Sequence, residues 1–163
     1  LEDDKVALAK EILEKVKTSK TKFELPEDVL MADKFDKDAH TKEMFSDRIT
    51  SDFNDWIGVD IGPKTIHKYR EEILRSNTII WNGPMGVFEI DIFAVGTVEI
   101  AKALAEATKK GAVTIVGGGD SASAIAKAKL EDKVTHVSTG GGASLEFLEG
   151  KKLPGVEALS EDS

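Results

Sequence analysis

Residues 112–121 read Ala-Val-Thr-Ile-Val-Gly-Gly-Gly-Asp-Ser, an apolar run that ends in a glycine triplet. A short run rich in β-branched residues that stops at glycine is typical of a buried strand. A second unit of the same kind lies downstream, where Val134–Ser138 leads to Gly140, Gly141 and Gly142. Small polar residues and a helical pattern follow both triplets. The sequence therefore predicts strand, glycine turn and helix twice in succession.

The same alternation extends upstream of these two units. Strands are expected at 56–61 and 78–81, and helices from about Thr65 to Arg75 and from Phe93 or Gly96 to the stop at Gly111. Strands and helices that alternate four times predict an α/β fold. We expect a mostly parallel sheet with helices on both faces, in a Rossmann-like three-layer arrangement. Apolar strands such as 112–116 suit a sheet that is buried on both sides.

The first third of the chain is less regular. Apolar residues at helical spacing predict a helix from Val6 to Val16, with Asp3 or Asp4 as its N-cap. The alternating segment 22–25 resembles a short strand that stops at Pro26. The polar segment 33–55 is expected to be a loop with short strands.

Composition limits the class of protein. The chain has 163 residues, 40% of them hydrophobic, which suits one globular domain. Its formal net charge of −8 argues against a nucleic-acid partner but permits a local anion site. It has no cysteine, so disulfides, thiolate metal sites and cysteine nucleophiles are excluded. No apolar run reaches membrane-spanning length, and no signal peptide is visible.

The glycine triplets are the candidate ligand site. In an open parallel sheet, ligands bind beyond the carboxyl ends of the strands, where both triplets are expected to lie. Glycine lets the backbone approach a ligand closely, and the following helix N-terminus favours an anion, most often phosphate. The alternative is that each triplet is only a tight turn between a strand and a helix.

Three further features accompany the triplets. Asp120 could hold Mg²⁺ between itself and a phosphate, or could be the N-cap of the next helix. Ser121 and Ser123 could donate hydrogen bonds to phosphate or cap the same helix. In the segment 82–89, Asn-Gly-Pro-Met-Gly-Val-Phe-Glu, apolar residues could flank a flat base and Glu89 could bind ribose hydroxyls. The alternative there is a rigid turn with Val87 and Phe88 in the core.

Several known motifs do not match. The sequence contains no Gly-x-x-x-x-Gly-Lys-Ser/Thr phosphate loop. Gly117, Gly119 and Ala122 satisfy the looser dinucleotide pattern, but the next strand ends without the acidic residue that binds ribose, which weakens an oxidoreductase interpretation. The three histidines show no metal-ligand spacing. Neither triplet contains Lys or Arg, so the cations that phosphoryl transfer needs would have to come from elsewhere.

Taken together, these motifs resemble those of the phosphoglycerate kinase family. The matching segments are 32–35 (Ala-Asp-Lys-Phe), 56–63 (Trp-Ile-Gly-Val-Asp-Ile-Gly-Pro), 81–89, 116–121 and 138–151. The resemblance implies reversible phosphoryl transfer from 1,3-bisphosphoglycerate to ADP, giving 3-phosphoglycerate and ATP, with Mg²⁺, in glycolysis. It also implies that residues 1–150 are part of the nucleotide-binding domain, incomplete at its N-terminal side. Residues 151–163 would return to an N-terminal substrate domain.

The resemblance also assigns roles by motif. Gly58 and Val59 would line the adenine pocket, Asn82, Gly83, Pro84 and Met85 would border the nucleotide, and Glu89 would hold the ribose. Gly118, Gly119 and Ser121 would contact phosphates, and Asp120 would hold Mg²⁺. Gly140, Gly141 and Gly142 would face the group in transfer. The family often has Thr at the position of Ser121, which keeps the hydroxyl.

The resemblance implies missing parts as well. The family's Gly-Ala-Lys segment, whose lysines hold the nucleotide phosphates, and the whole substrate domain would precede Leu1. The chain alone is therefore expected to be inactive, and the complete enzyme is expected to be a cytoplasmic or plastid monomer without membrane or nucleic-acid partners. The remaining alternatives are a non-catalytic nucleotide-binding module and a Rossmann oxidoreductase.

Overall fold

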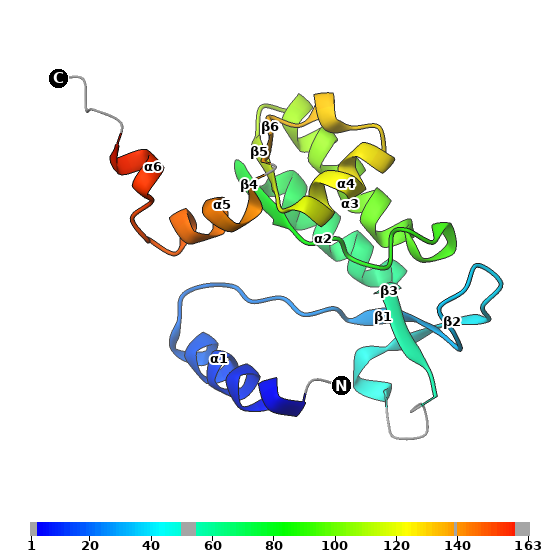
Figure 1. Ribbon diagram of the computed structural model, residues 1–163. Coiled ribbons are helices and arrows are strands. Elements are labelled where there is room, and N and C mark those ends of the chain that lie inside the picture. The colour runs from blue at the N-terminus through cyan, green and yellow to red at the C-terminus, as the bar shows by residue number, and fades with distance from the viewer. Residues whose placement is uncertain (1–2, 50–54, 139, 159–163) are drawn as a thin grey trace.

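The computed structural model describes residues 3–49, 55–138 and 140–158. These residues form two three-stranded sheets with helices (Figure 1). The helices are α1 Val6–Thr18, α2 Pro63–Arg75, α3 Val95–Lys109, α4 Gly119–Lys127, α5 Gly141–Leu148 and α6 Pro154–Glu157. The strands are β1 Asp28–Ala32, β2 Thr41–Phe45, β3 Ile57–Ile61, β4 Thr78–Asn82, β5 Val113–Gly117 and β6 His136–Ser138.

The parallel sheet has the strand order β4-β5-β6. Thr78 pairs with Val113 and Asn82 with Gly117, and the register continues from Gly117 to Ser138. The expected strands and the helices that follow them are confirmed, and so is the α/β class. β6 is shorter than predicted, since it starts at His136 instead of Val134.

The other sheet is antiparallel, with the order β2-β1-β3. The strand expected at 56–61 therefore exists as β3, but it pairs with β1 and not with the parallel strands. The local pattern carries no sign of this, because the partner of a strand depends on residues far along the chain. β2 is one of the short strands expected within 33–55, of which residues 50–54 lie outside the described part.

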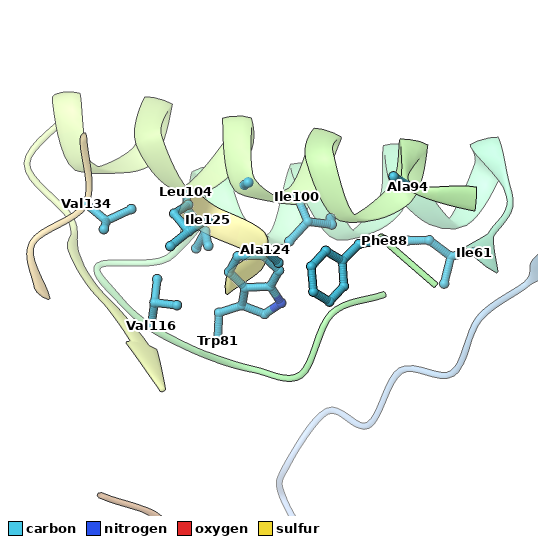
Figure 2. Close-up of a cluster of buried hydrophobic side chains, with 11 residues drawn as sticks. Ile61, Trp81, Phe88, Ala94, Ile100, Leu104, Val116, Ala124, Ile125 and Val134 are labelled. Carbon is cyan, nitrogen blue, oxygen red and sulfur yellow. The ribbon is translucent and has the colours of Figure 1, made fainter. Parts of the chain in front are cut away.

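The main core lies between one face of the parallel sheet and the helices α2, α3 and α4. Trp81 from β4 and Val116 from β5 pack against Ile100 and Leu104 of α3 and Ile125 of α4. Figure 2 shows the indole of Trp81 beside the Phe88 ring, with both rings beneath α3. This side of the sheet carries most of the buried apolar surface.

The second face of the parallel sheet is only partly covered. Side chains of α5 lie along it, but Ile80 of β4 remains 43% exposed. The expectation of a sheet buried on both sides therefore holds for the first face and only in part for the second. The apolar character of the strands is typical of a sheet that is covered on both faces. Among the described residues, only α5 and the neighbouring C-terminal segment cover this second face.

Two expectations in the N-terminal third are wrong. The helix α1 forms, but a 3-10 turn over Asp3–Lys5 precedes it and its N-cap position is Lys5, not Asp3 or Asp4. Segment 22–25 is not a strand. It is held to α2 by ion pairs instead, with Lys22 2.7 Å from Glu72 and with Lys68 bound to Glu24. No helix in the described part is long and apolar enough to cross a membrane.

A buried carboxylate joins the antiparallel sheet to α2. Asp28 of β1 is only 5% exposed, and it accepts hydrogen bonds from the backbone N–H groups of Lys64 and Thr65 at 3.0 and 2.8 Å. The Thr65 hydroxyl donates to the same carboxylate at 2.7 Å. Burial alone raises the pKa of Asp28, but the hydrogen bonds from Thr65 and Lys64 outweigh it and leave the pKa below its usual value. Asp28 thus caps a helix that lies far away in the sequence.

Replacing this cap tests its contribution. We expect Asp28→Asn to lower the free energy of unfolding by about 2 kcal/mol near pH 7, because charged hydrogen bonds to the first turn of α2 are lost. The stabilisation by Asp28 is present above its unfolded pKa of about 4 and is lost as the pH falls through the lower folded value. Urea unfolding measures the effect. Asp38→Asn in an exposed turn is the control, and an equal loss in both variants would contradict the cap.

Candidate functional site

The predicted ligand segments meet at one edge of the parallel sheet. Asn82, Gly117 and Ser138 end their strands side by side in register. The loop 82–89, the first triplet and the second triplet follow these three positions directly. The structure therefore brings together the segments that the sequence analysis selected.

The first triplet forms the start of α4. Gly118 is the N-cap and has φ +94° and ψ 145°, a conformation that side chains with a Cβ rarely adopt. A Cβ at Gly118 would also lie 2.9 Å from the side-chain oxygen of Asn82. Gly118 thus needs glycine for its backbone angles and for its close approach to β4. This explains one residue of the triplet as a turn and leaves Gly119 without a steric requirement, since a Cβ there would meet nothing within 4 Å among the described residues.

The second triplet begins α5. Gly140 is the N-cap residue, and Gly141 and Gly142 are the first two residues of the helix. A Cβ added at Gly140 or Gly142 would have no neighbour within 4 Å, so packing among the described residues requires glycine at neither position. The hydroxyls of Ser138 and Ser144 lie 2.8 Å apart and join the strand end to the helix. Backbone N–H groups at this helix start are available to a ligand at the same edge.

Asp120 is the second residue of α4 and not its N-cap, which is Gly118. Its side chain is exposed. The capping alternative is therefore wrong for Asp120. An acidic side chain in the first turn still interacts favourably with the positive end of the helix dipole. Within the described ranges, no group of three or more His, Cys, Asp or Glu residues is placed to hold a metal. A metal at Asp120 would need most of its ligands from a bound molecule.

The two serines have different positions. Ser121 is only 1% exposed, and its hydroxyl oxygen accepts the N–H of Gly83 at 2.6 Å. Ser121 therefore fixes the start of the loop 82–89, and its hydroxyl hydrogen is left to donate elsewhere. The hydroxyl of Ser123 donates to the carbonyl of Gly119 at 2.9 Å, within its own helix. Neither serine makes the capping bond of α4.

The loop 82–89 is held by backbone hydrogen bonds. The N–H groups of Met85 and Gly86 both donate to the hydroxyl oxygen of Thr97 at 3.1 Å. The N–H of Val87 donates to the carbonyl of Val59 at 2.8 Å. This bond places the strand β3, with Gly58 and Val59, directly beside the loop. The loop is thus fixed from α3 on one side and from β3 on the other.

The far end of the loop combines core and surface. Phe88 is buried in the main core, as the rigid-turn alternative expected, while the Glu89 side chain is exposed. Lys127 at the end of α4 donates to the carbonyls of Phe88 and Glu89 at 2.7 and 3.2 Å and pairs with Asp91 at 2.7 Å. Burial of Phe88 confirms one part of the rigid-turn alternative, and Val87 is only partly buried. The role of Glu89 at the ribose stays a prediction.

Sequence reasoning missed the residues that support the loop. Thr97 and Lys127 hold the loop, and Asp60 holds its neighbour Gly96. Thr97 and Lys127 lie outside the matching segments, and Asp60 lies in the segment 56–63 but was assigned no role there. Asp60 lies within the strand 56–61 as a charged residue between apolar neighbours, which was the one available signal. Thr97 and Lys127 carry no such signal, because their partners are backbone atoms distant in the sequence.

The glycine requirement at the first triplet can be tested directly. We expect Gly118→Ala to lower the free energy of unfolding by about 1–3 kcal/mol, because Ala must adopt a backbone conformation that is nearly exclusive to glycine. Gly119→Ala is the matched control and should be neutral or stabilising, since Gly119 is helical and a Cβ there meets no described atom within 4 Å. Urea unfolding of both variants decides. Equal stabilities would contradict the assignment.

Comparison with known proteins identifies the family. The family model for phosphoglycerate kinase matches residues 1–151. The phosphoglycerate kinase of Chloroherpeton thalassium is 65% identical over 160 residues, which is 98% of this chain and 40% of that protein. The phosphoglycerate kinase of Thermosipho africanus is 55% identical over 165 residues, covering 98% of this chain and 39% of that protein.

Solved structures agree with the sequence matches. Phosphoglycerate kinase from Coxiella burnetii superposes with a TM-score of 0.86 at 40% identity, over 96% of this chain and 38% of that one. The enzyme from Pyrococcus horikoshii OT3 gives a TM-score of 0.74 at 36% identity, over 96% and 36%. This chain thus spans about 40% of the length of the curated relatives it matches. The chain belongs to the phosphoglycerate kinase family.

Proposed function

We propose that this chain supplies the Mg-nucleotide half of a phosphoglycerate kinase active site. The observation that carries the proposal is that three strands end side by side on one edge of the sheet, at Asn82, Gly117 and Ser138, and that each end lies at a glycine-rich segment. Two of them lead into helix N-termini, which favour phosphate groups. The loop that follows Asn82 supplies apolar side chains and an exposed carboxylate, that of Glu89.

The proposed reaction is reversible phosphoryl transfer between an acyl phosphate and ADP. A terminal oxygen of the ADP β-phosphate attacks the phosphorus of the 1-phosphate of 1,3-bisphosphoglycerate. The bond from that phosphorus to the carboxyl oxygen breaks, and its electron pair stays on the carboxylate. The products are ATP and 3-phosphoglycerate, so no further reactant is needed. The phosphoglycerate would be bound by the part of the enzyme that this chain does not include.

Positions in the structure support the roles that the resemblance assigns around the base and ribose. Gly58 and Val59 lie on β3, which the bond from Val87 to Val59 holds against the loop. Asn82, Gly83, Pro84 and Met85 form the first half of that loop. Glu89, at its far end, has an exposed carboxylate that can accept from ribose hydroxyls. In this proposal the base and ribose would lie along the loop, with β3 on one side.

The phosphate end would be formed by the triplets. Gly118 and Gly119 would present backbone N–H groups to the phosphates. The resemblance also assigns a phosphate contact to Ser121, but the Ser121 hydroxyl is buried and accepts the N–H of Gly83, so in this structure it supports the site by holding the loop. Gly140, Gly141 and Gly142 would face the phosphoryl group in transfer. A Cβ at Gly119, Gly140 or Gly142 would meet none of the described atoms within 4 Å, and this open space supports a close approach of ligand to backbone.

Asp120 is the residue that would hold Mg²⁺. Its exposed carboxylate in the first turn of α4 suits a cation that takes one or two protein carboxylates and the rest of its ligands from phosphate and water. When bound, Mg²⁺ would neutralise charge on the phosphates. Without a cation, the Asp120 carboxylate would repel a phosphate at the helix start. Its role is therefore to make nucleotide binding depend on the metal.

The wider assignments are proposals too. Residues 1–150 would belong to the nucleotide-binding domain, and 151–163, with α6, would return to the substrate domain. We propose a cytoplasmic monomer that acts in glycolysis. A non-catalytic nucleotide-binding module is the alternative for the isolated chain, because the chain spans only about 40% of its relatives. The Rossmann oxidoreductase interpretation is wrong, since the family model is that of a kinase.

Calorimetric titration with ADP tests the nucleotide site. We expect the chain to bind ADP in the presence of Mg²⁺ without turnover, and Asp120→Ala to weaken that binding roughly tenfold, the effect of losing about 1.4 kcal/mol at the metal. In excess EDTA, the variant should bind no worse than the parent chain. Asp132→Ala is the control, because Asp132 lies in the 3-10 turn Glu131–Lys133, which precedes β6 at the edge of the sheet opposite the candidate site. Equal MgADP affinity in parent and Asp120→Ala would refute the assignment of the metal, and no binding at millimolar MgADP would refute the nucleotide site.

A further inference from the structure

Asp60 is a buried carboxylate that the proposed function does not yet use. It lies on β3 next to Val59 and is only 5% exposed. One oxygen, Oδ2, accepts the backbone N–H of Gly96 at 2.6 Å. The other, Oδ1, accepts the N–H of Ile61 at 2.9 Å. A single side chain thus ties the strand β3 to the first turn of α3.

Two glycines pack directly against this carboxylate. A Cβ at Gly86, in the loop 82–89, would overlap Oδ1 of Asp60, and a Cβ at Gly96 would overlap the same oxygen. The carboxylate therefore fills the space between the loop and the helix start. Any change in the size or position of the carboxylate must therefore displace the backbone at Gly86 and at Gly96, because close-packed interiors transmit such displacements.

The contacts continue from Asp60 to the loop. Gly96 precedes Thr97, whose hydroxyl oxygen accepts the N–H groups of Met85 and Gly86. The second anchor of the loop is the bond from Val87 to the carbonyl of Val59, the residue next to Asp60. One anchor, Thr97, is thus next to Gly96, which Asp60 holds, and the other, Val59, is next to Asp60 itself. Through them the carboxylate fixes the separation of β3 and α3, and with it the position of the loop against β3.

We propose that Asp60 is the positioning residue of the proposed nucleotide site: through Gly96 and Gly86 it fixes the loop 82–89 against β3, so that nucleotide affinity depends on its carboxylate. This inference rests on the proposed nucleotide site. Asp60 does not touch the ligand in this proposal. Its effect passes through the backbone of residues 85–87.

The charge state of Asp60 provides a specific signature. Burial raises the pKa of Asp60 to about 6, against the opposing effect of the hydrogen bonds from Gly96 and Ile61. Burial and these two hydrogen bonds account for the shift in the pKa of Asp60. Within the described part of the chain, no charged side chain of β3, the loop or α3 contributes to it. Above this pKa both oxygens accept N–H groups. Below it, the protonated oxygen is a poorer acceptor and carries a hydrogen into a space already filled by Gly86 and Gly96.

Stability and binding should therefore respond to pH in opposite directions. Between about pH 4 and pH 6 the folded chain holds the Asp60 proton and the unfolded chain does not, so the Asp60 contribution to stability falls as the pH rises through this window. Nucleotide affinity should instead rise as Asp60 ionises. If Asp60 had only a structural role, its ionisation would change the stability of the chain and leave the nucleotide affinity unchanged.

The decisive experiment compares MgADP affinity in the parent chain and in Asp60→Asn by calorimetry from pH 5 to pH 8. We expect the variant to bind about tenfold more weakly at pH 8 and about as well as the parent at pH 5. Titration of the nucleotide itself affects both proteins equally and cancels in the ratio. A ratio that is constant across this range, or equal affinity at pH 8, would overturn the proposal.

Asp28→Asn is the matched control, because Asp28 is an equally buried carboxylate on the neighbouring strand that caps α2 and not α3. It should lose stability and leave the pH profile of MgADP binding unchanged. If its affinity ratio follows pH as that of Asp60→Asn does, general destabilisation is the cause and the proposal fails.

A second measurement needs neither nucleotide nor a folded variant. In NMR spectra of the parent chain, the amide signals of Gly86, Gly96 and Thr97 should titrate together with a midpoint near pH 6, while that of Thr65 beside Asp28 should not. Amide signals that stay constant from pH 5 to pH 8 would refute the coupling of Asp60 to the loop. Loss of MgADP binding at every pH in the parent, with titrating amides, would refute the nucleotide site and retain the role of Asp60 in positioning the loop.

Discussion

The hydrogen-bond ladder of β4, β5 and β6 is the constraint on which the candidate site depends. Parallel pairing in a fixed register sets Asn82, Gly117 and Ser138 side by side, so the segments that follow them emerge at one edge. A slip of one residue would turn the core-facing side chains Trp81 and Val116 away from α3. The apolar packing beneath α3 therefore fixes the register, and the register fixes the site.

Much of this arrangement could be predicted from the sequence because it depends on local patterns. Apolar runs that lead to a glycine triplet predicted β5 and β6, and helical spacing predicted α2 and α3. The edge on which the glycine triplets meet follows from parallel topology, which the alternation of strands and helices already implies. The resemblance also predicted the family, which the matched family model confirms.

The unpredicted parts depend on partners that are distant in the sequence. β3 has an ordinary strand pattern, but its antiparallel partner β1 lies about 30 residues earlier. Segment 22–25 alternates like a strand, yet in the structure its polar side chains bind α2. The anchors of the loop 82–89 are a threonine and a strand carbonyl, neither of which differs in sequence from many others. Pairing and side-chain-to-backbone contacts of this kind leave no periodic trace.

The packing of Asp60 between Gly86 and Gly96 has a consequence for protein design. The carboxylate occupies the volume that two Cβ atoms would need, so these three positions share one space although they lie on a strand, a loop and a helix. Substitutions scored one at a time would reject every change at either glycine. A designer who shortens position 60 must fill the vacated space from position 86 or 96, and one who adds a methyl group there must shorten position 60. The three residues must therefore be chosen together, and the loop can be moved closer to β3 or farther from it only by redesigning all three.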